Sequence, residues 1–201
     1  MKFKLLKKID YKTTKWSGGN TTELFIYPED SSYEKRDFLF RLSSATVNLE
    51  KSTFTKLEGI SRKLMLLSGQ MELVHKDKHT KKLIPFMQDG FMGEWDTQSY
   101  GKAKDFNLMT RLNSSGELKH INILPNSEEL LELKSIEASK CIEILYSFDN
   151  SVNIFIEKEE LLLEKEECLI VFRDKCDFEY TIKIRNHTKS FGNLILSKIY
   201  L

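Results

Sequence analysis

Cysteine is scarce in this chain, with three residues at positions 141, 168 and 176 among 201. No two of them form a C-x-x-C pair, and an odd number does not suit a fully paired disulfide framework. The sequence therefore argues against a disulfide scaffold and against a zinc site built from cysteine. We interpret the three thiols as reduced residues that serve mainly in packing.

The chain also lacks an excess of charge and a long apolar run. Thirty-one Lys and Arg residues against thirty Asp and Glu leave a net charge of +1, so no electrostatic argument favours nucleic acid or an anionic membrane as a partner. No apolar segment approaches the ~20 residues of a membrane span, and residues 1–8 lack the apolar centre of a signal peptide. We therefore expect a cytoplasmic protein that binds neither.

Alternating polarity is what the chain does contain, and it predicts β-strands. In residues 38–45 and 105–112 the even positions are mainly apolar, and side chains in a strand point alternately to the two faces of a sheet. The odd positions carry Leu39, Arg41, Ser43 and Ala45 in the first segment, and Asp105, Asn107, Met109 and Arg111 in the second. Two arginines, an amide and a carboxylate are therefore expected to line one surface.

Two interpretations of this mixed surface are open. Half-solvated strands are common in antiparallel sheets, so the polar face could simply meet water. Against this, Leu39, Ala45 and Met109 stand among the polar groups, whereas an exposed face usually carries Lys, Glu and Thr. A partly apolar surface with a few convergent polar groups is typical of a ligand pocket.

A longer series of motifs resembles the HutD/Ves family. The series covers about residues 15 to 112, and its ordered length makes a chance match far less plausible than for one short motif. Its members are Trp16-Ser-Gly-Gly19, Thr21-Thr-Glu23, Phe40-Arg41-Leu42-Ser43-x-Ala45, Phe54-x-x-Leu57-x-Gly59, Arg62-x-Leu64-x-Leu66-Leu67-x-Gly69, Pro85-Phe86 and Asp105-Phe-Asn107-x-Met109-x-Arg111.

The resemblance implies an all-β bicupin, with two cupin-like (jelly-roll) β-barrels in one chain. We place the first barrel at residues 1–112, with the family motifs, and the second at residues 113–201, with an approximate boundary and with strand exchange allowed. The second half carries no clustered catalytic set, so its expected role is to cover the first barrel or to form a homodimer interface.

The resemblance and the strand faces together predict a binding site for a small carboxylate. The arginines would bind the carboxylate in a charge-assisted, often bidentate manner, and a buried arginine would otherwise pair with Asp105 or Glu23. The family context implies a histidine-degradation intermediate resembling formylglutamate or urocanate, in a regulatory or accessory role. The predicted ligand-binding residues are Trp16, Glu23, Arg41, Ser43, Arg62, Asp105, Asn107, Met109 and Arg111.

The histidines predict neither a metal nor another cofactor. Metal-dependent cupins use two His and a Glu on one strand and a His on a later one, but the four histidines of this chain form no H-x-H pair. His75 and His79 flank a predicted turn in a lysine-rich hairpin. We interpret them as surface residues without a carboxylate ligand at cupin-like spacing.

Two other functions remain open beside binding. A metal-independent enzyme would use Glu23 or Asp105 as general acid or base on a small amide or carbonyl compound. A carboxylate beside an arginine normally has a lowered pKa, which suits an ion pair better than a general acid, so we favour binding over catalysis. The third function is a structural or protein-binding module with a filled barrel.

Overall fold

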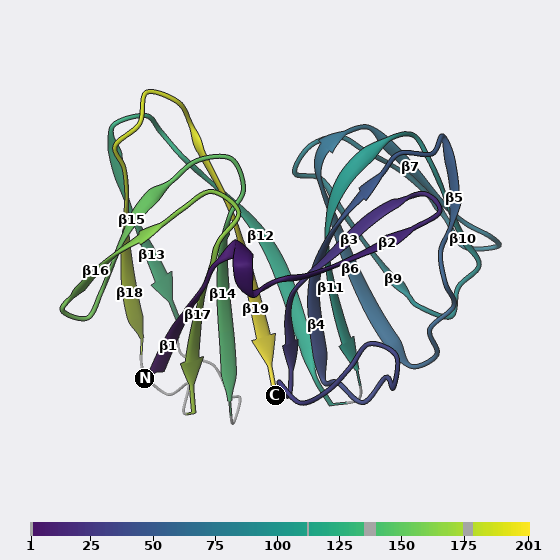
Figure 1. Ribbon diagram of the computed structural model, residues 1–201, viewed down its shortest axis with the longest axis horizontal. Helices are drawn as coiled ribbons and strands as arrows, with labels where there is room; N and C mark the ends of the chain where they lie inside the picture. Colours follow the sequence, from purple (N-terminus) through teal and green to yellow (C-terminus); the bar gives the residue numbers. More distant parts are fainter. Residues whose placement is uncertain (1, 112, 135–139, 175–178) are drawn as a thin grey trace. The chain divides into compact units, whose positions relative to one another are not determined.

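The computed structural model describes residues 2–111, 113–134, 140–174 and 179–201. The regular elements in these ranges are β-strands, apart from the short 3-10 helix η1 (Lys8–Asp10), so the all-β prediction is confirmed (Figure 1). Within these ranges no helical segment has both the length and the apolar character that a membrane crossing requires.

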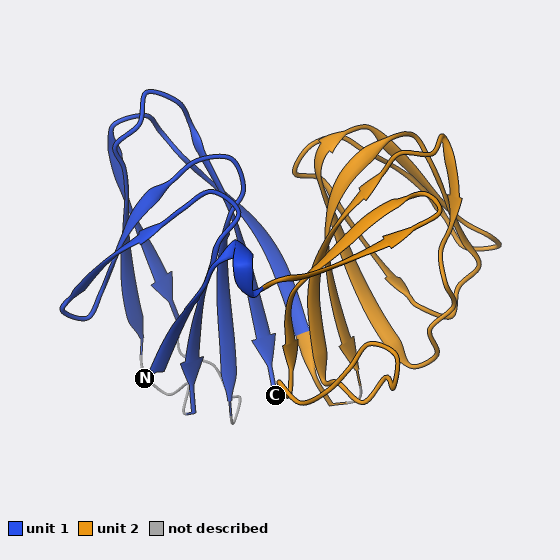
Figure 2. Ribbon diagram, in the orientation of Figure 1, with its two compact units in different colours: residues 1–10, 116–201 blue, residues 11–115 orange. Residues whose placement is uncertain are grey.

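The chain forms two compact units (Figure 2). We call residues 11–115 the central unit, and residues 1–10 with 116–201 the terminal unit. The expected division at residues 112 and 113 differs from this one chiefly at the N-terminus. There, β1 (Lys2–Leu6) pairs antiparallel with β17 (Cys168–Arg173), so the first strand is part of the terminal unit's sheet.

Two open sheets form the central unit. One has the strand order β2-β3-β4-β11-β6-β9 and the other β5-β10-β7-β8. The bounds are β2 (Lys12–Trp16), β3 (Gly19–Tyr27), β4 (Phe40–Val47), β5 (Lys51–Thr53), β6 (Ile60–Gly69), β7 (Met71–His75), β8 (Thr80–Leu83), β9 (Gln88–Met92), β10 (Thr97–Tyr100) and β11 (Ala103–Arg111). The pairing of β11 with both β4 and β6 places three of the predicted motifs in adjacent strands.

The terminal unit also consists of two open sheets, in the orders β1-β17-β14-β19-β12 and β13-β18-β15-β16. Its remaining strands are β12 (Ser115–Ile123), β13 (Ser127–Leu133), β14 (Cys141–Ser147), β15 (Val152–Ile156), β16 (Glu159–Leu163), β18 (Tyr180–Asn186) and β19 (Gly192–Tyr200). No sheet formed by the described strands closes on itself, so the expected closed barrels are replaced by paired open sheets.

Each unit buries apolar side chains that both of its sheets supply. In the terminal unit a cluster of fourteen buried residues includes Leu145 and Leu196 from one sheet, and Ile154 and Ile182 from the other. The central unit has a cluster around Leu64 and Leu73, and a second around Phe38 and Met109. At the end of β6, Gly69 has a φ of 84° and lies so close to β11 that a Cβ atom would stand 2.3 Å from the Lys102 carbonyl oxygen, so only glycine fits there.

Candidate functional site: a cavity with buried arginines

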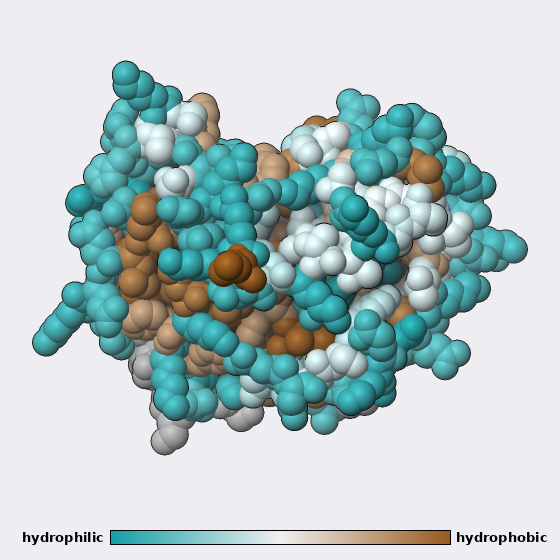
Figure 3. Space-filling view, in the orientation of Figure 1, coloured by the Kyte–Doolittle hydropathy of each residue, from teal (hydrophilic) through white to brown (hydrophobic). Residues whose placement is uncertain are grey.

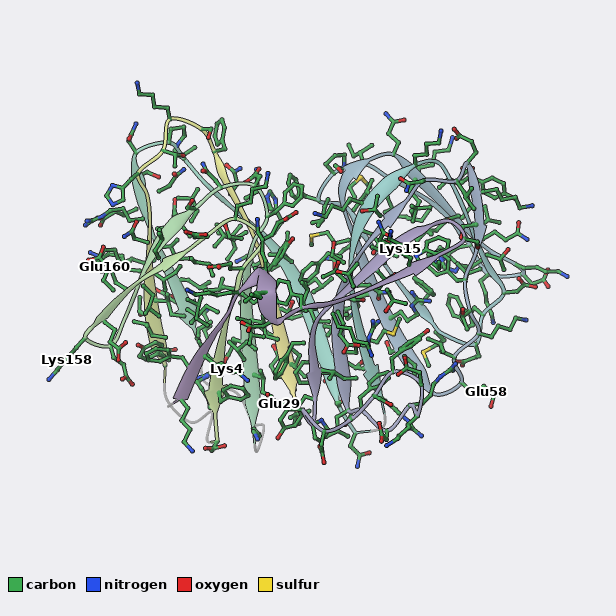
Figure 4. The ribbon with its side chains drawn as sticks, viewed as in Figure 1. Lys4, Lys15, Glu29, Glu58, Lys158 and Glu160 are labelled. Carbon is green, nitrogen blue, oxygen red and sulfur yellow. The ribbon has the colours of Figure 1, made fainter. Side chains whose placement is uncertain are left out.

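A cavity of about 470 Å³ lies in the central unit. Strands β2, β3, β4, β6 and β11 of one sheet contribute to its wall, together with residues 31–34 and 52–55. In β2 the lining residues alternate with Lys15, which Figure 4 labels and which does not line the cavity. On the face shown in Figure 3, the surface over the central unit is mostly hydrophilic or intermediate in hydropathy.

Strand alternation explains why β4 and β11 dominate this wall. The lining residues are Arg41, Ser43, Ala45 and Val47 from β4, and Asp105, Asn107 and Met109 from β11. The antiparallel register sets Asn107 opposite Ser43 and Met109 opposite Arg41, so the polar positions share one face as predicted. Arg41, Ser43, Asp105 and Asn107 are all buried. This polar face therefore lines a cavity, and its side chains are buried rather than spread on a flat water-facing surface.

Arg41 is held from three sides. Its Nε donates to Glu23 Oε2 at 2.6 Å, and its Nη1 donates to Ser43 Oγ at 3.2 Å. Its guanidinium carbon also lies 4.5 Å from the centre of the Tyr33 ring, within the range of a cation–π contact. The expected pairing of a buried arginine with Glu23 is thus present. One carboxylate and one ring fix the guanidinium at the cavity wall.

Arg62 is less completely satisfied. Its guanidinium carbon lies 4.7 Å from the centre of the Phe54 ring and 5.1 Å from that of Phe91, but its buried Nε has no hydrogen-bond partner among the described residues. Burial lowers the pKa of Arg62 to about 10, despite attraction from Asp105. The side chain therefore stays positively charged at neutral pH.

Asp105 compensates that charge only in part. Burial raises its pKa to about 7, against the opposing effects of Arg62 and a backbone hydrogen bond from Ala45. The negative charge of Asp105 is therefore easily lost near neutral pH. Since Glu23 already pairs with Arg41, the cavity keeps a partial positive charge that centres on Arg62, and this charge grows below pH 7.

Asn107 adds a hydrogen-bond acceptor to this surface. Its side-chain oxygen is buried and has no partner in the described part of the chain. A buried polar atom without a partner costs about 1–3 kcal/mol, so such an atom in a cavity wall is a natural contact for a ligand. The wall thus offers an anion-binding group and an acceptor for an N–H group.

Eight of the nine residues predicted from the sequence line this one cavity: Trp16, Glu23, Arg41, Ser43, Arg62, Asp105, Asn107 and Met109. Arg111 does not. It shares their strand face, but it lies at the end of β11, where its guanidinium donates to the backbone carbonyl of Arg36. The structure therefore keeps Arg111 out of the cavity wall by binding it to a neighbouring loop.

Comparison with known proteins places this chain in a family. The HutD family model matches residues 8–190. The chain belongs to the HutD family. No curated protein matches its sequence.

Solved structures that resemble this chain indicate its fold. A conserved protein of unknown function, PA5104 from Pseudomonas aeruginosa PAO1, has 20% identity and a TM-score of 0.82, with 100% of both chains covered. HutD from Pseudomonas fluorescens SBW25 has 20% identity and a TM-score of 0.71, covering 99% of this chain and 98% of that one. An oxalate decarboxylase mutant from Bacillus subtilis has 6% identity and a TM-score of 0.65, covering 98% and 76%. This HutD-family protein therefore has a cupin-like fold.

Some cavity residues of this HutD-family protein were not predicted as site residues. Tyr33 lies in the segment between β3 and β4, and Phe54 follows β5; each places its ring on a buried arginine. Phe54 belongs to one of the family motifs, which was a usable signal. Tyr33 stands in a charged, serine-containing loop, and no local pattern marks a loop residue as a cation–π partner.

The interpretation of His75 and His79 as surface residues is wrong for His75. His75 is buried at the end of β7, and burial lowers the pKa of its imidazole. The sequence spacing also did not point to Asp89 of β9, which lies within hydrogen-bond distance of both rings. Strand pairing in the fold brings it to the histidines.

Proposed function

We propose that this HutD-family protein binds a small carboxylate-bearing molecule in the cavity of the central unit. The observation that carries the proposal is Arg62, a buried arginine in a cavity wall whose Nε has no hydrogen-bond partner among the described residues. Burial also raises the pKa of its carboxyl neighbour Asp105 to about 7. A ligand carboxylate would supply the missing acceptor and the missing negative charge. Charge-assisted hydrogen bonds of this kind contribute about 1.5–3 kcal/mol each.

Other features support the class of ligand. A volume of about 470 Å³ suits a small molecule rather than a protein segment. The free oxygen of Asn107 would accept a hydrogen bond from an amide or imine N–H group, while Met109 and Ala45 offer apolar contact. A molecule with a carboxylate at one end and a formamide or imidazole group at the other fits this set. Formylglutamate and urocanate have this composition.

The family's name links it to histidine use, which agrees with a ligand from histidine degradation in a regulatory or accessory role.

We further infer that each unit is one cupin-like module, so that the chain is a bicupin. Two observations support this division. Each unit consists of two sheets, and the similarity to the oxalate decarboxylase structure extends over 98% of this chain.

Calorimetric titration of the full chain tests the proposal. The probes are N-formylglutamate and urocanate, and the neutral control is the diamide of formylglutamate, which lacks both carboxylates. We expect saturable binding of a carboxylate probe with one site, and binding that is tighter at pH 6 than at pH 8 because Asp105 is then protonated. Binding of the diamide as tight as that of formylglutamate would contradict a carboxylate site.

Variants locate the site. Arg62→Met should weaken carboxylate binding about 10-fold or more, because it removes a charged donor from the wall. Lys63→Met removes the same charge from the next position of β6, which does not line the cavity, and should leave the affinity unchanged. Equal affinities of the two variants would place the anion elsewhere.

A second function rests on Asp105 itself. A carboxyl group with a pKa of about 7 in a cavity could act as a general acid or base at neutral pH. The amide or imine group of the bound molecule would then be the reacting group. Incubation of the protein with N-formylglutamate, followed by NMR, would show product formation that Asp105→Asn abolishes if this function is real.

A further inference from the structure

A second group of chemically active side chains lies in the central unit outside the cavity wall. His75 at the end of β7, His79 in the following turn and Asp89 on β9 bring their ligand atoms within 4.8 Å of one another. His79 Nε2 is 2.9 Å from Asp89 Oδ2, and His75 Nε2 is 3.2 Å from the same oxygen. None of the three lines the cavity.

The fold holds these three groups in place by its backbone. The amide of His75 donates to the carbonyl of His79 at 2.9 Å, which closes the hairpin between β7 and β8 and folds the second histidine back over the first. Asp77 within this turn has a φ of 58°, the left-handed conformation of a tight turn. The position of Asp89 is fixed by the pairing of β9 with β6, in which it lies opposite Leu64.

The distances match those of a metal site. A tetrahedral ion with bonds of about 2.0–2.1 Å to nitrogen and oxygen separates its ligand atoms by roughly 3.3 Å. The two separations from Asp89 Oδ2 are 3.2 and 2.9 Å, close to this value. All three ligand atoms lie within 4.8 Å of one another, so the two histidine nitrogens would adjust their spacing around one ion. Two imidazole nitrogens and one carboxylate oxygen are a ligand set for zinc-like transition metals rather than for Mg²⁺ or Ca²⁺, which prefer oxygen.

The surroundings of His75 fit the role of a ligand. Its Nδ1 lies 2.8 Å from Thr97 Oγ1, and that hydroxyl is 3.4 Å from the carbonyl of Trp95. When a metal occupies Nε2, the ring proton must stand on Nδ1. The Thr97 hydroxyl is placed to accept a hydrogen bond from this Nδ1–H group and to donate one to the backbone carbonyl of Trp95. Hydrogen-bonded partners of this kind orient histidine ligands in metal sites.

Aromatic rings enclose the group on one side and leave it open on another. The rings of Phe91 and Trp95 stand 4.6 and 5.5 Å from that of His75, whose side chain is fully buried. His79, in contrast, is 39% exposed. An ion could thus enter past His79, and a water molecule could complete its coordination from that side.

We propose that His75, His79 and Asp89 bind one transition-metal ion of the zinc class, with a fourth position open to solvent. The proposal does not rest on the carboxylate site proposed above, although Phe91 contacts both His75 and Arg62. Without the ion, the same three residues form a hydrogen-bonded chain, in which Asp89 accepts from both rings. When a metal takes the two Nε2 positions, each neutral ring keeps its single hydrogen, which then stands on Nδ1; in His75 it faces Thr97 Oγ1.

The test uses the full chain after treatment with a chelator and its removal by dialysis. Titration with Zn²⁺ should show one equivalent bound with micromolar or tighter affinity, and Co²⁺ should produce the visible absorption of a four- or five-coordinate ion. Mg²⁺ should not bind. Zn²⁺ should also raise the thermal unfolding midpoint, because it binds the folded state. The absence of a stoichiometric Zn²⁺ complex would overturn the proposal.

Variants assign the ligands. His79→Ala, at a partly exposed turn residue, and Asp89→Asn should each weaken Zn²⁺ binding by about 10-fold or more and remove the Co²⁺ absorption. His187→Ala removes an exposed histidine of the terminal unit and should change nothing. Because the buried His75 could be needed for folding, its replacement is left out of the test. Zinc binding that survives both His79→Ala and Asp89→Asn would show that the ion is held elsewhere and would overturn the assignment.

Discussion

The two units both bury arginines and carboxylates, but they satisfy them differently. In the terminal unit Arg173 Nε lies 3.1 and 3.2 Å from the two carboxylate oxygens of Glu143, and its Nη2 donates to the carbonyl of Lys134 at 3.3 Å. In the central unit Arg62 Nε has no described partner, and burial raises the pKa of its neighbour Asp105 to about 7. A saturated ion pair supports a fold, whereas a buried arginine with an unpartnered nitrogen in a cavity wall leaves a hydrogen bond for a ligand.

The buried apolar clusters of the described residues also differ between the two units. Among the described residues of the terminal unit, a large cluster of buried side chains draws on strands from β12 to β19. In the central unit the cavity has Val47 of one cluster and Met109 of another in its wall. The polar groups of β4 and β11 lie between these clusters. In the central unit the cavity thus lies beside two separate apolar clusters.

The largest effect should come from breaking the saturated pair. Glu143→Leu leaves the guanidinium of Arg173 buried without its carboxylate, and breaking a buried pair in this way costs about 3–5 kcal/mol. We expect the free energy of unfolding, measured by urea denaturation, to fall by this amount. In the double variant Glu143→Leu with Arg173→Met no charge remains, and most of the stability should return. A double variant as unstable as the single one would show that packing, rather than charge, dominates at this place.

Asp105 should give a smaller effect of opposite sign, visible in its pH dependence. Its pKa is raised from 3.8 to about 7 in the folded protein, so the folded state holds more protons than the unfolded state between these values. Stability should therefore fall as the pH rises from about 4 to 7, by up to about 1.4 kcal/mol per pH unit. Asp105→Asn should remove this fall. The free energy of unfolding of the variant minus that of the natural protein should therefore be larger at pH 8 than at pH 4, by roughly 1–3 kcal/mol.

The measurement compares urea unfolding of both proteins at pH 4, 5, 6, 7 and 8. The matched control is Glu23→Gln, whose carboxylate pairs directly with Arg41 and should cost stability at neutral pH when removed. A natural protein whose stability does not depend on Asp105 over this range would mean that water or another group relieves the buried charge.

Strand alternation made much of the cavity predictable from the sequence. Asp105, Asn107 and Met109 on one strand and Arg41 and Ser43 on another could be assigned to one face because the period of a strand is two residues. The family motifs then brought Trp16, Glu23 and Arg62 into the same set. Most of the candidate site thus depended on local geometry, which a sequence displays directly.

Long-range arrangement set the limit of that prediction. Arg111 has the correct strand face but lies where the backbone carbonyl of Arg36 binds it, and the position of that loop follows from the whole unit. Asp89 approaches His75 only through the pairing of β9 with β6. The first strand likewise joins β17, more than 160 residues away along the chain. The local alternation of polar and apolar residues does not predict such contacts, because they depend on which distant strands pair with each other.

The smallest effect in the comparison should come from one substitution made in both units. Ser197 of the terminal unit is fully buried, and its hydroxyl has no partner among the described residues, so Ser197→Ala removes a polar atom that burial penalises. We expect a change within about 1 kcal/mol that favours the variant. Ser43 of the central unit instead accepts a hydrogen bond from Arg41, so Ser43→Ala should cost about 0.5–1.5 kcal/mol. Urea unfolding midpoints of the two variants, measured side by side, give the difference. If Ser197→Ala proves as costly as Ser43→Ala, its hydroxyl has a partner such as a buried water molecule, and the terminal unit holds a polar contact that its apolar core does not suggest.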